Sequence, residues 1–272
     1  MSRYLFILCP NYSGSTLLWR LVSTSPHVSA LPAEGQFLPE LREIMRTKPW
    51  DADHPLPWDH IRQVWHRYWD PSKRFALEKS PPNLIRAPQI ESHFSPASFI
   101  VMVRDPYAHC EGLMRRNGAD ARTAAEFSLD CLRAQRDNAS RLDNAISFTY
   151  EQLCDDPRGT AQRILEFLPD LETLDWQAQF KVHAIDGNAA RTIHNYNAVK
   201  LRELGNQHVR VITEVLSQAP DVLSYWGYKL YEPDLRHRLG HLSNNVRKRM
   251  VRLRQSGGAL WRRHVRRNSR KA

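Results

Sequence analysis

We predict an α/β fold, with a central parallel sheet flanked by helices on both faces, from three observations. Short apolar segments, each long enough for one strand, recur along the chain. Amphipathic segments of helical length separate them, as is typical of parallel sheets, whose crossovers are usually helices. The first apolar segment, Tyr4–Cys9, lies almost at the start of the chain, and we expect this strand to be central in the sheet.

The predicted strands are apolar segments bounded by turn-forming residues: Tyr4–Cys9, Phe75–Glu78, Ser98–Val103 and Ala145–Tyr150. Ser98–Val103 is the most uniformly apolar of them, which is typical of a strand buried on both faces. The predicted helices have apolar residues at helical spacing or a proline in the first turn: Ser15–Ser23, Glu40–Arg46, Trp58–Trp69, Pro106–Arg116, Ala121–Asn144, Pro157–Leu168 and Ala198–Ser217. We expect Val28–Pro32 to be a connection and Tyr225–Tyr228 to close the core.

Charge divides the 272 residues into two parts. Residues 235–272 contain 13 of the 39 Lys and Arg side chains and none of the 29 Asp and Glu side chains, so residues 1–234 are slightly acidic. We therefore predict one α/β domain over residues 1–234 and a basic amphipathic helical tail over residues 235–272. Because the excess positive charge is confined to the tail, we do not expect the protein to bind nucleic acid.

The four cysteines are scattered, with no Cys-x-x-Cys pair, which favours reduced thiols over a disulfide framework. No cluster of His, Cys and carboxylate residues has metal-ligand spacing, so we expect no metal. No apolar segment approaches the roughly 18 residues of a membrane span, and no signal-type leader is evident. These features predict a soluble, cytoplasmic protein.

The turn after the first predicted strand, Pro10–Ser15, is small and polar and leads into a helix. Backbone amides of such a loop, together with the helix dipole, attract a phosphate. The P-loop of nucleoside triphosphatases has the pattern G-x-x-x-x-G-K-[ST], but here Cys9 replaces the first glycine and Ser15 replaces the lysine. The loop is thus only P-loop-like, and a kinase or an ATPase is disfavoured. An ordinary turn is the alternative.

Two arginines indicate a second phosphate site. Arg104 ends the strand Ser98–Val103, at the sheet edge where ligands bind in open α/β sheets, and Arg116 lies twelve residues later on the next helix. Guanidinium groups bind phosphates through two parallel hydrogen bonds. A surface pair between Arg104 and Asp105, with Arg115 and Arg116 solvated, is the alternative. One loop and one arginine pair together imply a nucleotide with two well-separated phosphates.

Several segments, in the same order, resemble the sulfotransferases. FILCPNYSGSTLL is similar to their 5′-phosphosulfate loop, and VMVRDPYAHCEGLMRR to their 3′-phosphate-binding strand and helix. ALPAEGQFL and LEKSPPN resemble the segments that carry the acid/base and a sulfuryl-contacting lysine in Golgi-type and bacterial members. FTYEQLCDDPRGTAQRILEFL is similar to the next strand and helix. The resemblance covers about residues 4–228 and predicts this fold and a PAPS-dependent sulfotransferase.

The resemblance implies 3′-phosphoadenosine 5′-phosphosulfate (PAPS) as the donor and a hydroxyl or amine as the acceptor. It makes Glu34 the base and Lys79 the contact to the bridging oxygen or sulfuryl group. Arg104 and Arg116 would bind the 3′-phosphate, and the loop amides and hydroxyls the 5′-phosphate. The cofactor-binding positions carried over from the family are Tyr12, Ser13, Gly14, Ser15, Thr16, Leu17, Arg104, Gly112, Arg116 and Tyr196.

Two of these positions depart from the family. Tyr12 stands where the family usually has Lys or Arg, which helps neutralise the leaving phosphate. Gly112 stands where the family usually has a serine. Lys79 alone, Arg20 or another basic group must then replace the first, and a backbone amide or a neighbouring residue the second. The lost cation also makes a non-catalytic nucleotide-binding or interaction protein on the same fold the alternative function.

Sulfuryl transfer requires positioning more than covalent catalysis, with a base for the acceptor proton and donors for the leaving oxygen. We expect a partly buried Glu34 to be that base, with His27 and His109 as rivals. We expect the two prolines after Ser80 to fix the direction of Lys79. The structural alternatives are a turn carboxylate before Gly35 and a surface lysine paired with Glu78.

The tail has apolar residues at three- and four-residue steps among arginines, the pattern of a basic amphipathic helix. It can bind an anionic membrane surface, attract an anionic acceptor, or pack on the domain. The acceptor itself stays open among carbohydrate, lipid headgroup, small molecule and peptide tyrosine. We expect residues 36–69 and 191–197 to shape its pocket, with Trp50, Trp58, Trp65 and Trp69 either stacking on it or belonging to the core.

Overall fold

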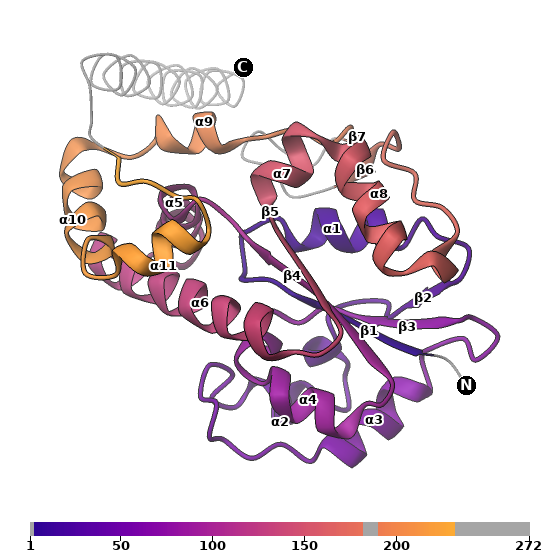
Figure 1. Cartoon of the computed structure of the whole chain (residues 1–272). Coiled ribbons are helices and arrows are strands. Elements are labelled where there is room, and N and C mark those ends of the chain that lie inside the picture. Colours follow the sequence, from indigo (N-terminus) through magenta and orange to yellow (C-terminus); the bar gives the residue numbers. More distant parts are fainter. Residues whose placement is uncertain (1–2, 182–189, 232–272) are drawn as a thin grey trace, which may run out of the picture.

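The computed structural model describes residues 3–181 and 190–231, and its centre is a five-stranded sheet of order β2-β3-β1-β4-β5 (Figure 1). Every neighbouring pair is parallel, with β1 in the middle. The strands are β1 (Arg3–Leu8), β2 (Val28–Ala30), β3 (Phe75–Glu78), β4 (Ala97–Val103) and β5 (Ala145–Thr149). The predicted fold class and the central place of the first strand are confirmed.

The helices of the described residues are α1 (Ser15–Val22), α2 (Arg42–Arg46), α3 (Trp58–His66), α4 (Ala87–His93), α5 (Pro106–Asn117), α6 (Ala121–Arg141), α7 (Tyr150–Asp155), α8 (Pro157–Phe167), α9 (Asn197–Leu201), α10 (Asn206–Leu216) and α11 (Pro220–Tyr225). Short 3-10 turns lie at Gly35–Phe37, Pro81–Ile85 and Pro169–Leu171. The strands β6 (Phe180–Lys181) and β7 (Ala190–Arg191) form a small antiparallel pair.

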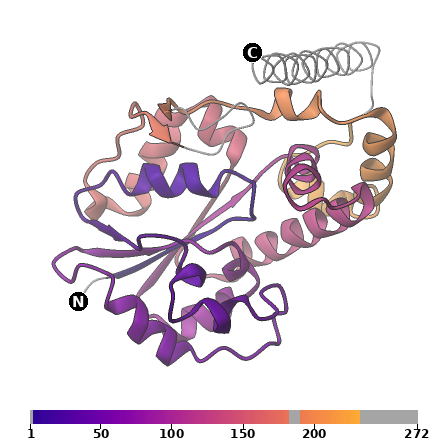
Figure 2. The ribbon, with the colours of Figure 1, turned by 180° about the vertical axis from the view of Figure 1, so that it is seen from behind.

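Side chains of β1 alternate between two apolar cores, because successive residues of a strand point to opposite faces. Tyr4, Phe6 and Leu8 belong to one core, together with residues of α3, α4, α6 and α10. Leu5 and Ile7 belong to the other, with residues of α1 and α8. Figures 1 and 2 show these helix layers on opposite sides of the sheet. The sheet is therefore buried on both faces, as its apolar strands predict.

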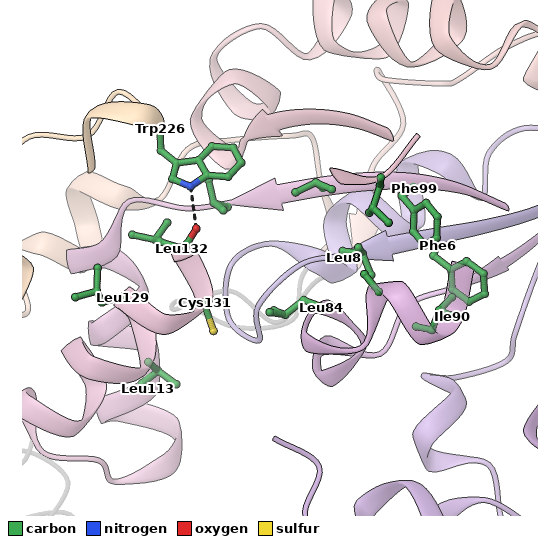
Figure 3. Packing of buried hydrophobic residues seen from close by; sticks show 14 of the residues in the cluster. Phe6, Leu8, Leu84, Ile90, Phe99, Leu113, Leu129, Cys131, Leu132 and Trp226 are labelled. Atoms are coloured by element: carbon green, nitrogen blue, oxygen red, sulfur yellow. Dashed lines mark hydrogen bonds between the residues drawn. The ribbon is translucent and has the colours of Figure 1, made fainter. Parts of the chain in front are cut away.

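The last described residues close the larger core. Trp226, just after α11, donates a hydrogen bond from its indole nitrogen to the carbonyl oxygen of Leu132 in α6, at 3.1 Å (Figure 3). Three of the four tryptophans considered for the acceptor are core residues, since Trp58, Trp65 and Trp69 are at most 6% exposed. The half-buried Trp50 packs edge-on against Phe127, which lies in α6. The core interpretation of this group is confirmed.

Several predicted elements were wrong in detail. Val28–Ala30 is a strand rather than a connection, because it pairs with β3 over three residues. The single helix expected at Ala198–Ser217 is divided into α9 and α10, with Gly205 at the N-terminal cap of α10. The helix expected to reach Asn144 ends at Arg141. The sequence also did not reveal α4 or α7, although Thr149 and Gln152 form a capping box that marks the start of α7.

The described helices include none that is both long and apolar enough to cross a membrane. The four cysteines are free and buried. The predicted basic tail, residues 235–272, lies outside the described residues.

Candidate active site

Residues at the carboxyl ends of all five strands gather at one edge of the sheet, where ligands bind in open α/β folds. The P-loop-like turn follows β1, Glu34 follows β2, Lys79 follows β3, Arg104 follows β4, and Tyr150 follows β5. A cavity of about 270 Å³ lies there, lined by Asn11, Tyr12, Gly14, Ser15, Thr16, Leu17, Glu34, Pro81, Arg104, Arg115, Arg116, Tyr150, Arg191, Thr192, His194, Tyr196 and Lys200. Parallel topology thus brings the predicted segments together.

The loop after β1 places the N-terminus of α1 against this cavity. Gly14 is the N-cap residue with φ +94°, and a Cβ atom there would lie 2.5 Å from the ring of Tyr150, so glycine is required twice over. Within the described residues, no side chain caps this helix and no acidic residue lies in its first turn. Its first amides are thus available to an anion. Ser13, by contrast, is fully buried and does not line the cavity.

Tyr12 turns away from the loop and lies along α5. Its backbone has φ 61°, in the left-handed region, and its hydroxyl donates to Oδ1 of Asn117 at 2.5 Å. Its carbonyl oxygen accepts a hydrogen bond from Nη1 of Arg104 at 3.1 Å. Tyr12 therefore connects the loop to α5 and does not supply the charge of the cation that the family usually has.

Arg104 is 6% exposed and fixed on three sides. Its Nε donates to Oδ1 of Asn197 at 2.8 Å, its Nη1 donates to Tyr12, and its guanidinium lies 3.9 Å from the ring centroid of Tyr150. Its Nη2 is buried and has no hydrogen-bond partner among the described residues. A buried donor left unpaired costs free energy, so this atom fits a ligand that accepts hydrogen bonds. The alternative of a surface pair with Asp105 is wrong.

The helix α5 carries further charge on the cavity wall. Arg116 is exposed and lines the same cavity as Arg104, as predicted. Arg115 also lines it and is paired with the buried Glu111 at 2.6 Å. Glu111 lies 2.9 Å from the ammonium of Lys200, which α9 brings to this wall. The sequence analysis missed Lys200, because no local pattern connects α9 to α5.

Tyr196, expected near the cofactor, does line the cavity. Its hydroxyl accepts a hydrogen bond from Nη1 of Arg191 at 2.9 Å, and its backbone nitrogen donates to the hydroxyl of Tyr150 at 3.3 Å. Arg191 and His194 line the cavity beside it. Part of the segment 191–197 thus belongs to the wall of the anion cavity, where we had expected an acceptor pocket.

Glu34 and Lys79 lie in direct contact. The Lys79 ammonium is 2.5 Å from Oε1 of Glu34, and Nε2 of Gln36 donates to Oε2 at 2.6 Å. The side chain of Lys79 is 6% exposed and that of Glu34 is 22% exposed. Glu34 lines the cavity, whereas Lys79 lies just behind it. The structure therefore unites the two residues that the sequence placed 45 positions apart, with a carboxylate reachable from the cavity.

Glu78 ties together the two loops that carry this pair. One of its oxygens accepts hydrogen bonds from the amide of Gly35 at 2.9 Å and the hydroxyl of Ser80 at 2.5 Å. The other accepts from the amide of Ser80 at 3.1 Å and from Asn83 at 2.5 Å. Burial raises the pKa of this carboxyl to about 7. Glu78 thus does not pair with Lys79 at the surface, and that alternative is wrong.

The two rival bases lie elsewhere. His27 contacts Glu172 at 2.9 Å, and neither residue lines the cavity. His109 is 2% exposed, its Nδ1 lies 3.0 Å from the hydroxyl of Ser128, and burial lowers its pKa to about 3. Neither histidine lines the cavity, which favours Glu34.

The charge of the cavity suits an anionic nucleotide. Five of its lining residues are Arg or Lys and one, Glu34, is acidic and already paired with Lys79. Nη2 of Arg104 and the first amides of α1, neither of which has a side-chain partner among the described residues, are donors on two different elements. These residues fit a nucleotide with two phosphates. No group of three or more His, Cys, Asp or Glu side chains in the described parts of the chain is arranged to hold a metal ion.

Comparison with known proteins supports the sequence resemblance. A family model described as the sulfotransferase family matches residues 5–175, which contain the main sheet apart from the first two residues of β1. No curated protein matches the chain significantly. The sulfotransferase domain from the curacin biosynthetic pathway shares 20% identity with a TM-score of 0.57, over 85% of this chain and 99% of that domain. A sulfotransferase from Alicyclobacillus acidocaldarius shares 12% identity with a TM-score of 0.52, over 85% of this chain and 98% of that enzyme. The two solved structures show a common fold, and the family match, over more than half of the chain, shows that this protein belongs to the sulfotransferase family.

Proposed function

We propose that this protein transfers a sulfuryl group from PAPS to an acceptor hydroxyl or amine, with Glu34 as base and Lys79 at the leaving oxygen. One observation carries the proposal. A single cavity is lined both by the carboxylate of Glu34, paired with a buried lysine, and by five cationic side chains. The first arrangement suits proton removal and the second suits a doubly phosphorylated donor.

The donor would lie between two anchors. The amides and hydroxyls of residues 13–17, at the start of α1, would hold the 5′-phosphate, with Ser13 contributing from behind the cavity surface. Nη2 of Arg104, which has no partner in the described part of the chain, and the exposed guanidinium of Arg116 would hold the 3′-phosphate. The ring of Tyr150 packs against the guanidinium of Arg104 and also limits the space beside Gly14. The two anchors therefore share one supporting side chain.

The bound donor supplies the sulfuryl group and departs as adenosine 3′,5′-bisphosphate. Glu34 accepts the proton of the acceptor hydroxyl or amine through Oε1, while Gln36 keeps the other carboxylate oxygen in place. Lys79 neutralises Glu34 in the structure, so its ammonium must turn towards the leaving oxygen before Oε1 is free. This exchange couples donor binding to the release of the base. A compact ammonium with three donors suits both positions.

A thermal-shift comparison tests the donor. We expect adenosine 3′,5′-bisphosphate to raise the Tm and ATP with magnesium to leave it unchanged, since a ligand that binds only the folded state stabilises it. If neither nucleotide changes the Tm, a non-catalytic interaction protein on this fold is favoured. A response to ATP with magnesium alone would favour a P-loop kinase.

Activity is tested by transfer from labelled PAPS to a panel of carbohydrates, lipid headgroups, small molecules and tyrosine peptides. We expect at least one acceptor class to be labelled by the wild type and not by Glu34→Gln. If no acceptor is labelled although the bisphosphate binds, the chain binds the nucleotide without catalysis. The panel also identifies the acceptor class, which the residues that line the cavity do not indicate.

A further inference from the structure

The two positions that depart from the family pattern contact each other. A Cβ atom on Gly112 would lie 2.8 Å from Cβ of Tyr12 and 2.9 Å from Nζ of Lys200. Real Cβ atoms do not approach other atoms this closely, so a side chain at position 112 is incompatible with Tyr12 where it lies. The space beside α5 is thus already filled, on one side by Tyr12 and on the other by the ammonium of Lys200.

Lys200 reaches this place from α9, which lies more than eighty residues further along the chain. It is 5% exposed, yet it lines the cavity. Its ammonium donates to the carbonyl oxygen of Ala108 at 3.0 Å and lies 2.9 Å from Oε2 of Glu111. An ammonium has three donors, and no third partner is present among residues 3–181 and 190–231. One donor therefore remains for a ligand in the cavity.

The local charge also favours an anion beside Lys200. Glu111 is shared between Lys200 and Arg115, and Arg104 adds a third positive charge nearby. Burial, and then the charge of Arg104, lower the pKa of Lys200 to about 8. A buried cation beside other cations is costly unless an opposite charge compensates it. Because the single carboxylate of Glu111 faces both Lys200 and Arg115, it does not fully neutralise their charge.

We infer that Lys200 is a nucleotide-binding residue that donates to the same phosphate as Arg104 and Arg116. This inference rests on the proposed function, in which that phosphate is the 3′-phosphate of the donor. Gly112 has no side chain to make a polar contact with this phosphate, and Lys200 makes that contact from α9 instead. Tyr12, which lies along α5, occupies the other side of the space beside Gly112. The 3′-phosphate site would then be assembled from β4, α5 and α9 together.

The test compares two nucleotides that differ in one phosphate, adenosine 3′,5′-bisphosphate and AMP, by calorimetry on the full chain. We expect Lys200→Met to weaken binding of the bisphosphate about ten- to hundredfold, as for one lost hydrogen bond to a charged group. AMP lacks the 3′-phosphate, so its Kd should change less than about threefold by the same reasoning. Lys229→Met, which changes an exposed lysine outside the cavity, is the matched control and should alter neither Kd.

Lys200 also joins α9 to α5, so a structural role must be separated from a binding role. The single variant leaves the carboxylate of Glu111 without Lys200 as a partner, and the double variant Lys200→Met/Glu111→Gln removes that carboxylate as well. The double variant should show the same selective loss of affinity for the bisphosphate. Equal weakening of both nucleotides, or a lower Tm with an unchanged ratio of the two Kd values, would overturn the inference alone. A wild type that binds the bisphosphate no better than AMP would overturn the proposed function, and the inference with it.

Discussion

The two sides of the cavity differ in how their charges are balanced. On the side of β2 and β3, Glu34 is matched by Lys79 and Gln36, and Glu78 accepts hydrogen bonds from four donors. On the side of β4 and α9, two cations, Arg115 and Lys200, share one buried acid, Glu111, and among the described residues Arg104 donates only to the neutral Asn197 and the carbonyl oxygen of Tyr12. We name these the reaction side and the anchoring side.

The difference indicates where binding energy comes from. A side whose charges are already paired gains little from an anion, because a new contact must replace an existing one. A side where two cations share one carboxylate, and where Nη2 of Arg104 has no hydrogen-bond partner within residues 3–181 and 190–231, gains a full charge-assisted contact. We therefore expect the anchoring side to govern nucleotide affinity and the reaction side to govern turnover. The following predictions test that division.

The largest effect is expected on the reaction side, once an acceptor has been found. Glu34→Gln and Lys79→Ala should each lower kcat about 10²- to 10⁴-fold, as for loss of a general base or of a donor to the leaving group. Both should leave the Kd of adenosine 3′,5′-bisphosphate within a few fold of wild type. Steady-state kinetics and calorimetry measure the two quantities, with Glu166→Gln and Lys229→Ala, both exposed, as controls. Near-normal turnover in both variants would refute their assignment.

Arg104→Lys should have the opposite profile. It keeps the charge but loses the planar group that contacts Asn197, Tyr12 and the ring of Tyr150. We expect the Kd of the bisphosphate to rise about tenfold or more, and that of AMP to rise less. Calorimetry with both nucleotides provides the measurement. A variant with normal affinity and reduced kcat would show that the division between the two sides is wrong.

Gly14→Ala tests the loop that both sides share. An alanine at φ +94° is strained, and its Cβ would collide with the ring of Tyr150. We expect the free energy of unfolding to fall by about 2 kcal/mol. Urea denaturation measures this loss, and Gly118→Ala is a matched control, because Gly118 also has positive φ but nothing within 4 Å of the added atom. Equal losses in the two variants would mean that only backbone strain matters.

Glu78→Gln tests the scaffold of the reaction side. The amide would present N–H groups to donors that now face a carboxylate, so we expect a loss of about 1.5 kcal/mol in unfolding free energy. The folded-state pKa, about 7, lies above the ordinary value of 4.5. The folded state thus holds this proton more tightly, and the resulting stability is complete below about pH 4.5 and is lost as the pH rises through about 7.

The glutamine variant cannot titrate at this position, so its stability should fall less between pH 4.5 and 7 than that of the wild type. Urea denaturation across this range measures both slopes. Identical slopes of unfolding free energy against pH would show that titration of Glu78 does not contribute to the pH dependence of stability.

The smallest effect is expected for Tyr12→Phe. It removes the hydroxyl that donates to Asn117 but keeps the ring along α5. A single exposed hydrogen bond contributes about 0.5–1 kcal/mol, and nucleotide affinity should change less than threefold. Denaturation and calorimetry test both values. A large loss of affinity would show that the hydroxyl, rather than the close approach of the loop to α5, is the important feature of this residue.

The predictability of the site follows the same division between local and long-range contacts. The loop, Lys79 and Arg104 each lie directly after a predicted strand, where a local pattern marks them, whereas Glu34 was found only through the family resemblance of its segment. Lys200 carries no such mark, because its role depends on α9, which approaches α5 from more than eighty residues further along the chain. The direct contact of Glu34 with Lys79 also required the structure, since β2 was predicted as a connection and its pairing with β3 was not foreseen.

The sequence by itself determined the parallel sheet, the small polar loop before α1, the arginine at the end of β4 and the likeness to the sulfotransferases. Strand periodicity, turn residues and helix starts are encoded within a few neighbouring positions, so these features need no tertiary information. Only the tertiary structure decided that Tyr12 lies on α5, that Gly112 leaves space for the ammonium of Lys200, and that Glu78 joins the loops of the reaction pair. Each of these depends on contacts between residues from 43 to more than 100 positions apart or on the packing they produce, and such contacts form only when the sheet brings its strand ends to one edge.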